Sequence, residues 1–325
     1  MLTSDQNRKI NEIVEEFKEA ADFYRMEYSE DLMGMFRDFG CMLLLKCKVD
    51  TEGKADLERL LEGRHKLKGT VKRQLMTVSE ELAQLWAPGE QDGSGDTGEY
   101  EGSQNVREMF QTALEEIFHF CLYSKGGKNR YLLPEETAKP LLRLLTFPEG
   151  MMAGNEGLVV LDTQCGAGSA LMAASRYLKN LRLMGYEKDE EMWAAAVIMS
   201  QLSGLEMELH LEDGARADLY ESCDLVISNP VYGTDTIKDE ELIDQLPGEL
   251  KTVRGRYHME LIRSMQALNF DGKAMLIVPN SFLFANRTES MKVRKWLLQS
   301  YSLEAIISLP EDTFMYSGVR SGVMV

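Results

Sequence analysis

The sequence contains no long apolar run. Its 325 residues are 44% hydrophobic and 27% charged, as in an ordinary globular protein. The longest apolar stretches, such as residues 42–45 and 158–161, are far too short to cross a bilayer. Residues 1–20 alternate charged and apolar side chains and lack the apolar segment of a signal peptide. We therefore expect a cytoplasmic protein that does not bind membranes and has room for about two domains.

Cysteine is also scarce, and its spacing excludes two common uses of this residue. The chain has five cysteines, an odd number, and none of them forms a CxxC pair. This spacing predicts reduced thiols rather than disulfides, and it indicates no metal site. The five residues are Cys41, Cys47, Cys121, Cys165 and Cys223.

Positive charge is in deficit as well, with 36 Lys and Arg residues against 53 Asp and Glu residues and a net charge of −17. An acidic chain repels DNA at long range. Binding to DNA would therefore depend on a partner, on a further segment or on a local basic face. The local candidate is the group Lys251, Arg254, Arg256 and Arg263, which fits a phosphate-facing surface and a solvated helix start equally well.

The first part of the chain is predicted to be helical. Apolar residues recur at spacings of three and four, which predicts helices over about residues 10–24, 32–43, 67–85 and 106–118. Their apolar stripes are expected to form a core. Between the last two helices, a polar and glycine-rich segment predicts a mobile loop at about residues 88–105.

From about residue 126 strands alternate with helices, which predicts an α/β domain with a mainly parallel sheet covered on both faces. We therefore expect a helical N-terminal domain over residues 1–125 and an α/β domain over residues 126–325. Helices are expected at residues 169–178, 190–202, 258–268 and 291–299. Strands are expected at residues 158–162, 181–187, 207–211, 225–227, 274–279, 303–309 and 318–325.

One candidate site lies in residues 224–233, Asp-Leu-Val-Ile-Ser-Asn-Pro-Val-Tyr-Gly. The apolar run predicts a buried strand that must end at Pro230, so its neighbours project from the carboxyl edge, where such sheets bind ligands. The amide oxygen of Asn229 and the carbonyl of Pro230 can accept both hydrogens of a planar NH₂ group, while Tyr232 stacks on its face. A strand that simply ends in an Asn-Pro turn explains the same residues.

A second candidate site follows the strand at residues 158–162. Asp162 ends this strand, and Gly166 and Gly168 permit a tight turn into a helix. The pattern is not GxGxxG and has no P-loop lysine, which favours a nucleoside without phosphates. Twenty-five positions after Asp162, Glu187 ends the next strand and can accept both hydroxyls of a ribose.

A third acid, Asp213, follows the third predicted strand and is suited to the amino group of an adenine. Each of these acids alone also fits a helix N-cap or a solvated loop end. Three acids and a glycine turn in this order indicate a nucleoside cofactor.

These stretches resemble the N6-adenine DNA methyltransferases, in particular the modification subunits of type I restriction systems. The resemblance spans residues 126–325, and upstream Arg130-Tyr-Leu-Leu-Pro134 stands where the family keeps an aromatic-Thr-Pro segment beside the cofactor. The other matching stretches are Leu161-Asp-Thr-Gln-Cys-Gly-Ala-Gly-Ser, Ser228-Asn-Pro-Val-Tyr-Gly, Gly272-Lys-Ala-Met-Leu-Ile-Val-Pro-Asn-Ser-Phe-Leu-Phe and Leu303-Glu-Ala-Ile-Ile-Ser-Leu-Pro-Glu-Asp-Thr-Phe.

The resemblance implies a Rossmann-like, seven-stranded methyltransferase domain that binds S-adenosylmethionine and methylates a flipped adenine. Asn229 and Pro230 would hold the N6 amino group, and Tyr232 would stack on the base. Because the transfer needs no covalent intermediate, Cys165 is expected to be a small buried thiol in the glycine turn. The implied cofactor contacts are Tyr131, Pro134, Asp162, Cys165, Gly166, Gly168, Glu187, Asp213 and Asn229.

The resemblance also implies DNA as a partner, read through a specificity subunit or another DNA-reading protein in a restriction-modification complex. The chain departs from the family pattern at Thr163 and Val231, where the family has proline, and at Leu133, where it has threonine. These departures favour an alternative, a weakened methyltransferase-like module that holds the cofactor or a protein. A third hypothesis is methylation of a protein glutamine, whose amide is a similar planar group.

Overall fold

The computed structural model groups the chain into two compact units. The helical unit comprises Met1–Lys128 and Val197–Leu205, and the sheet unit comprises Asn129–Ala196 and Glu206–Val325. Compactness does not test whether each part folds alone, so a domain boundary at residue 126 stays a prediction. The structure describes residues 2–28, 31–49, 55–62, 67, 69–86, 97–124, 132–145, 157–219, 223–230, 235–311, 313–314 and 319–325.

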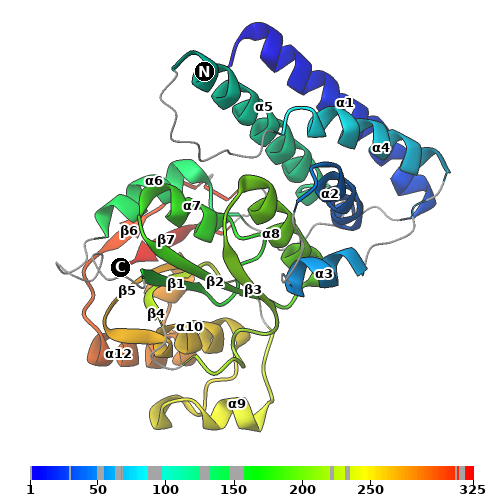
Figure 1. Ribbon diagram of the computed structural model, residues 1–325. Helices are drawn as coiled ribbons and strands as arrows, with labels where there is room; N and C mark the ends of the chain where they lie inside the picture. Colours follow the sequence, from blue (N-terminus) through cyan, green and yellow to red (C-terminus); the bar gives the residue numbers. More distant parts are fainter. Residues whose placement is uncertain are drawn as a thin grey trace. The chain divides into compact units, whose positions relative to one another are not determined.

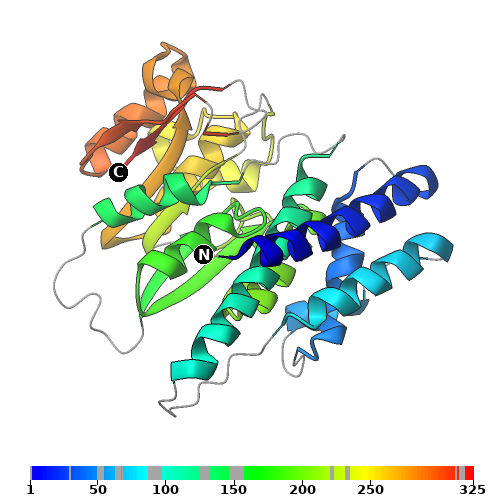
Figure 2. The same cartoon turned by 90° about the horizontal axis from the view of Figure 1, so that it is seen from above.

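The helical unit is built from amphipathic helices, which Figure 2 shows from above. The first helix begins with a capping box in which Thr3 and Gln6 satisfy each other's backbone N–H groups. The predicted helices correspond to α1, α2, α4 and α5, and α3 is an addition that sequence reasoning missed. Their bounds are α1 Ser4–Glu27, α2 Met33–Lys46, α3 Ala55–Glu62, α4 Gly69–Ala83 and α5 Thr97–Leu122.

Aromatic side chains fill the core of the helical unit. Phe17 and Phe39 meet edge to face with ring centroids 5.0 Å apart, and Phe36 packs on Phe118 at 5.1 Å. All four side chains are at most 3% exposed. The apolar stripes read from the sequence therefore do form a core, as expected.

The segment predicted to be a mobile loop at about residues 88–105 is in part helical. Helix α5 begins at Thr97, so the prediction is wrong for residues 97–105. An amphipathic helix that is already nucleated extends at little cost into flanking residues, which is why polar composition misplaced this boundary. Residues 88–96 lie outside the described part of the chain.

The sheet unit contains a seven-stranded sheet with the order β3-β2-β1-β4-β5-β7-β6. The first five strands of this order run parallel, and β7 is antiparallel to both β5 and β6. Strand order reverses between β1 and β4, which creates the crevice at which such sheets bind ligands. The strands are β1 Leu158–Asp162, β2 Leu181–Glu187, β3 Met207–Leu211, β4 Cys223–Ser228, β5 Leu268–Pro279, β6 Ile306–Ser308 and β7 Ser321–Met324.

Helices cover both faces of this sheet, as the alternation of strands and helices predicted. In Figure 1, α6 and α7 lie on one face, and α10 and α12 lie on the other. No helix in the described ranges is long and apolar enough to span a membrane. The helices that follow α5 in the chain are α6 Glu135–Leu144, α7 Ser169–Tyr177, α8 Glu190–Ser203, α9 Glu240–Asp244, α10 Arg256–Gln266, α11 Asn280–Phe284 and α12 Thr288–Ser300, with a 3₁₀ turn at Gly248–Leu250. Helix α8 is divided between the two units, since Val197–Leu205 belong to the helical unit.

Strand β5 begins earlier than predicted because it pairs with β4 across a bulge. The register shifts between the pairs Cys223↔Leu268 and Leu225↔Lys273, so the sequence of β5 loses its apolar pattern there. Asp224 holds the start of three strands together. Its carboxylate accepts hydrogen bonds from the backbone N–H of Val159 and from the side chain of Asn269, both at 2.9 Å. This acid is therefore an anchor at the amino edge of the sheet.

Candidate active site

Strand β1 ends in a buried acid. The side chain of Asp162 is 2% exposed, and its Oδ1 accepts a hydrogen bond of 3.0 Å from the backbone N–H of Gln164. Burial raises the pKa of Asp162 to about 7, the Gln164 hydrogen bond lowers it, and nearby Glu187 raises it. The carboxyl group is thus desolvated at the strand tip, where a ligand donor or cation would stabilise its charged form.

Strand β2 ends in a second held acid, Glu187. Its Oε2 accepts a 2.9 Å hydrogen bond from the N–H of Gly166, and its Oε1 accepts a 2.7 Å bond from the N–H of Asp189. Burial raises the pKa of Glu187, although hydrogen bonds from the backbone of Asp189, Gly166 and Lys188 lower it. Within the described part of the chain, no Lys or Arg forms an ion pair with Asp162 or Glu187. Both carboxylates therefore keep lone pairs for a ligand.

The glycine turn between β1 and α7 needs its glycines. Gly166 and Gly168 have φ values of +55° and +79°, in the left-handed region that other residues rarely adopt. Cys165 ties the turn to β2, because its N–H donates to the carbonyl of Tyr186 at 2.9 Å. Its thiol is buried against Gly185, where an added Cβ would lie 2.8 Å from the sulfur. Burial raises the pKa of the Cys165 thiol, so it stays protonated and serves packing.

The third acid, Asp213, differs from the other two because a cation holds it. Arg256 donates to both of its carboxylate oxygens, at 2.9 and 3.4 Å, and also to Glu260 at 2.9 Å. Burial raises the pKa of Asp213, but the hydrogen bonds and charge of Arg256 outweigh burial and lower it. Asp213 thus lies at the same edge with its charge already neutralised, and its contact with an adenine stays a prediction.

The segment before α6 lies beside the glycine turn. The N–H of Leu133 donates to the hydroxyl of Ser169, the first residue of α7, at 3.2 Å. Pro134 occupies the N-cap position of α6. Tyr131 lies outside the described residues, so its contact with a cofactor stays a prediction, as does that of Pro134.

The Asn-Pro turn emerges directly from β4. Asn229 is half-buried and Pro230 is buried, at the carboxyl end of the strand that neighbours β1. The structure therefore brings this turn and Asp162 to the same edge, on the two strands between which the strand order reverses. Val231 and Tyr232 lie outside the described residues, and the stacking role of Tyr232 stays a prediction.

The predicted basic stretch does not form one surface. The guanidinium of Arg263 is buried and donates to the carbonyls of Ala215 and Ala217 at 3.0 and 2.8 Å. Arg256 is engaged by Asp213 and Glu260, as described above. The prediction of a phosphate-facing or solvated role is therefore wrong for these two arginines, because interior acceptors use their donors.

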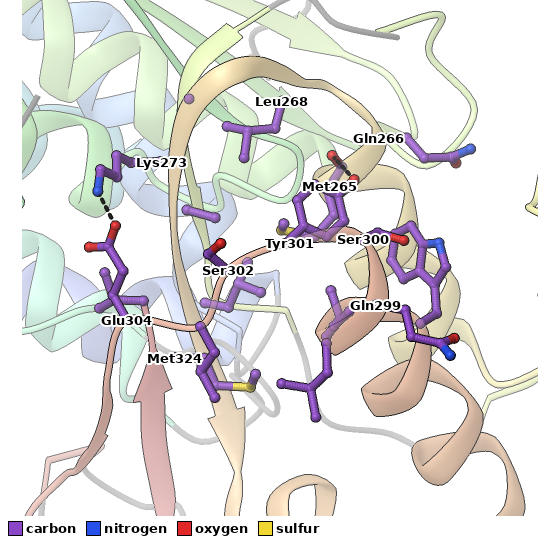
Figure 3. A pocket seen from close by; sticks show the side chains of 18 of the residues that line it. Met265, Gln266, Leu268, Lys273, Gln299, Ser300, Tyr301, Ser302, Glu304 and Met324 are labelled. Atoms are coloured by element: carbon purple, nitrogen blue, oxygen red, sulfur yellow. Dashed lines mark hydrogen bonds and ion pairs between the residues drawn. The ribbon is translucent and has the colours of Figure 1, made fainter. Parts of the chain in front are cut away.

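A depression of about 1270 Å³ opens at the other end of the sheet, where β4 and β5 begin (Figure 3). Tyr301 lies along it and donates from its hydroxyl to the carbonyl of Met265 at 2.9 Å. Lys273 and Glu304 form an ion pair at one side. None of the predicted site residues lines this depression, so it is separate from the carboxyl edge.

Comparison with known families tests the resemblance seen in the sequence. The family model for N-6 DNA methylases matches residues 107–325 of the chain. The chain belongs to the N-6 DNA methylase family. This confirms the resemblance that the glycine turn and the Asn-Pro turn indicated.

The relatives of this chain include restriction-modification proteins. It is 24% identical to the type I restriction enzyme MjaVII methylase subunit of Methanocaldococcus jannaschii over 295 residues, 83% of this chain and 46% of the relative. It is 26% identical to the type II restriction enzyme and methyltransferase RM.BcgI of Heyndrickxia coagulans over 190 residues, 53% of this chain and 28% of the relative. The chain spans less than half the length of each of these relatives.

Solved structures show the same fold. The methyltransferase subunit of a type I restriction-modification system from Streptococcus thermophilus superposes with a TM-score of 0.60 at 16% identity, covering 97% of this chain and 84% of that one. The type IIG restriction endonuclease BpuSI gives a TM-score of 0.54 at 17% identity, covering 99% and 39%. The predicted fold, a Rossmann-like seven-stranded methyltransferase domain after a helical region, is confirmed.

Proposed function

We propose that this N-6 DNA methylase family member is an S-adenosylmethionine-dependent enzyme that methylates the N6 position of a flipped adenine in DNA. One observation carries the proposal. Asp162 and Glu187 are desolvated, have no Lys or Arg partner among the residues that the structure describes, and flank a left-handed glycine turn; the Asn229-Pro230 turn leaves the neighbouring strand at the same edge. Buried acids whose pKa values are raised, in a crevice of this kind, favour a ligand site over a structural one.

The chemistry of these groups fits the cofactor. S-adenosylmethionine carries a ribose, an adenine and a cationic methionine end, and it supplies the methyl group when bound. Glu187 keeps lone pairs beside its backbone donors, so it can accept the ribose hydroxyls. Asp162 sits in the desolvated strand tip, where its charged form gains from a cationic ligand. Gly166 and Gly168 let the backbone approach the ligand closely.

The Asn-Pro turn supplies the proposed substrate contacts. The amide oxygen of Asn229 and the carbonyl of Pro230 accept the two amino hydrogens of the adenine, which leaves the nitrogen lone pair aimed at the methyl donor. Tyr232 stacks on the base after it has left the duplex. The chain then acts by positioning and electrostatics, and no residue forms a covalent intermediate.

The proposed setting is a restriction-modification complex in which a specificity subunit or another DNA-reading partner supplies target recognition. The relatives named above belong to restriction-modification systems, which favours DNA over a protein glutamine as the substrate. A net charge of −17 also favours a partner that provides the basic surface for phosphate. Two of the four candidate basic residues, Arg256 and Arg263, already donate to acceptors within the protein, which also favours a partner that binds the phosphates.

The experiment is methyl transfer from S-adenosylmethionine carrying a labelled methyl group to unmethylated genomic DNA. The DNA is digested to nucleosides, and the label is assigned by mass spectrometry. Label in N6-methyladenine that disappears in the variant Asn229→Ala supports the proposal. Label in protein glutamine, or transfer that persists in Asn229→Ala, contradicts it.

A further inference from the structure

Side chains connect β1 and β4 beyond the point where their backbones stop pairing. The two strands pair at Val160↔Leu225 and Leu161↔Val226. Extending this register by two residues places Thr163 opposite Ser228, at the carboxyl edge. There the strands diverge into the glycine turn on one side and the Asn-Pro turn on the other. The width of the crevice at this point sets the distance between the proposed cofactor and substrate contacts.

Gln164 spans this gap. Its Nε2 donates to the hydroxyl oxygen of Thr163 at 2.6 Å, and its Oε1 accepts from the hydroxyl of Ser228 at 3.4 Å. Its backbone N–H also holds Asp162, as described above. The same residue therefore contacts the acid at the end of β1 and the last residue of β4, which directly precedes Asn229.

The partners give these hydrogen bonds one direction. Ser264 on α10 donates from its hydroxyl to the carbonyl of Glu260 at 2.8 Å, so it can only accept from Thr163. Thr163 donates to Ser264 and accepts from Gln164, which in turn accepts from Ser228. Each hydroxyl in this series gives its single proton to the next group. The series is satisfied only when the Gln164 amide lies in the observed orientation.

Three of the four side chains are sealed from solvent. Ser228 and Ser264 are 0% exposed, and Thr163 is 1% exposed. A buried hydroxyl that loses its partner there has no water to replace it, so the network is maintained as a unit. The network ends on helix α10, which carries Ser264. The same helix carries Glu260, whose carboxylate accepts a hydrogen bond from Arg256.

We propose that Gln164 is a positioning residue, which fixes the Asn229-Pro230 turn relative to the cofactor turn across the crevice. This inference rests on the proposed function for its consequence in catalysis, but the bridge itself is a property of the unliganded chain. On the other side of β1, the turn is tied to β2 by the backbone hydrogen bond from Cys165 to Tyr186. On the β4 side, the amide of Gln164 performs this task.

The bridge is tested first without ligand, by hydrogen–deuterium exchange in a peptide covering residues 223–230. Gln164→Met keeps the length of the side chain and removes both hydrogen-bonding groups, and Gln299→Met is the same change at an exposed site. Ser228→Ala removes the other end with little change in volume, and Ser175→Ala is its control. We expect exchange about tenfold faster in Gln164→Met and Ser228→Ala, and no faster in the double variant, because both remove one coupling.

Unchanged exchange in Gln164→Met, or additive effects in the double variant, would overturn the bridge. This readout is independent of methyl transfer. If the variants exchange as expected but the wild-type chain methylates no DNA, the proposed function fails and the bridge stands.

The consequence for catalysis is tested by measuring cofactor binding and the rate of methyl transfer separately. We expect Gln164→Met to bind S-adenosylmethionine within about threefold of the wild-type Kd, yet to transfer about ten- to a hundredfold more slowly at saturation, because a misplacement of about 1 Å has effects of this size. A role confined to stability would lower the melting temperature and leave the rate of the saturated enzyme unchanged. That outcome would overturn the positioning role.

Discussion

Two kinds of carboxylate lie at the carboxyl edge of this sheet. Asp162 and Glu187 are held by backbone N–H groups, and burial raises the pKa of each. Asp213 is held by Arg256, and its pKa is lowered. Carboxyl groups at the ends of neighbouring strands thus have pKa values shifted in opposite directions.

The difference shows how carboxylates that bind a ligand can be told apart from carboxylates that stabilise the fold at the carboxyl edge of an α/β sheet. A carboxylate whose charge is already paired inside the protein gains little from a ligand cation or hydroxyl. A carboxylate that is desolvated, oriented and without an internal cation gains much more, and the fold has accepted a cost in stability to keep it so. As far as the described residues show, Asp162 and Glu187 belong to the second kind.

The largest expected effect separates binding from transfer. Asn229→Ala removes an amino-group acceptor on β4 and leaves both carboxylates in place. We expect methyl transfer to fall by about a thousandfold, because a preorganised acceptor at the reacting nitrogen is lost. The Kd for S-adenosylmethionine should stay within about threefold of wild type. Loss of both properties together would mean that the turn and the carboxylates do not have separate roles.

The next effect tests the structural kind of carboxylate. Asp213→Asn removes the negative charge that pairs with Arg256 and leaves that partly buried guanidinium without one of its two acids. We therefore expect the free energy of unfolding in urea to fall by about 2–3 kcal/mol. Asn180→Asp, which exchanges the same two side chains in the reverse direction at an exposed position before β2, controls for the chemistry of the change. A variant that keeps wild-type stability and instead loses cofactor affinity would place Asp213 with Asp162 and Glu187.

A smaller effect follows from pH. With its pKa raised to about 7 from 3.8, Asp162 binds a proton in the folded protein that the unfolded chain has already released between these values. Its contribution to stability is therefore fully present below about pH 4 and is lost as the pH rises through about 7. Asp162→Asn should remove this loss, so the variant should be more stable than wild type in urea unfolding at pH 8 and similar to it at pH 4.

The same group makes cofactor binding depend on pH in the opposite sense. A ligand that needs the ionised carboxylate competes with the proton, so the Kd for S-adenosylmethionine should rise by up to about tenfold per pH unit below pH 7. In Asp162→Asn the Kd should be higher than in wild type at every pH and should change less with pH. Any remaining dependence on pH should come from Glu187. A wild-type Kd that is constant from pH 5.5 to 8 would contradict the assignment of Asp162.

Much of this edge was predictable from the sequence, because its residues follow strands. The first three strands of the sheet match their predicted bounds, and so the acids and glycines that follow two of them fall where ligands bind. The start of β5 was not predictable, because a bulge that depends on the register of β4 sets it. The spacing of residues within one segment does not show how that segment pairs with a distant strand.

The partners of the polar groups were equally hidden. Arg256 and Asp213 are 43 residues apart, and the only local signal was the spacing of four between Arg256 and Glu260. Gln164 could not be predicted as a positioning residue, because a glutamine after a strand belongs to no recognisable sequence pattern. Its role becomes visible only when β1 and β4 are brought side by side.

The most direct test of the account is calorimetric titration of S-adenosylmethionine into the wild-type chain and into Glu187→Gln at pH 8. We expect micromolar binding to wild type and a Kd about ten- to a hundredfold higher in the variant, since hydrogen bonds to a charged group are lost. Equal binding by both proteins, or no binding by the wild type, would contradict the claim that these carboxylates form the cofactor site.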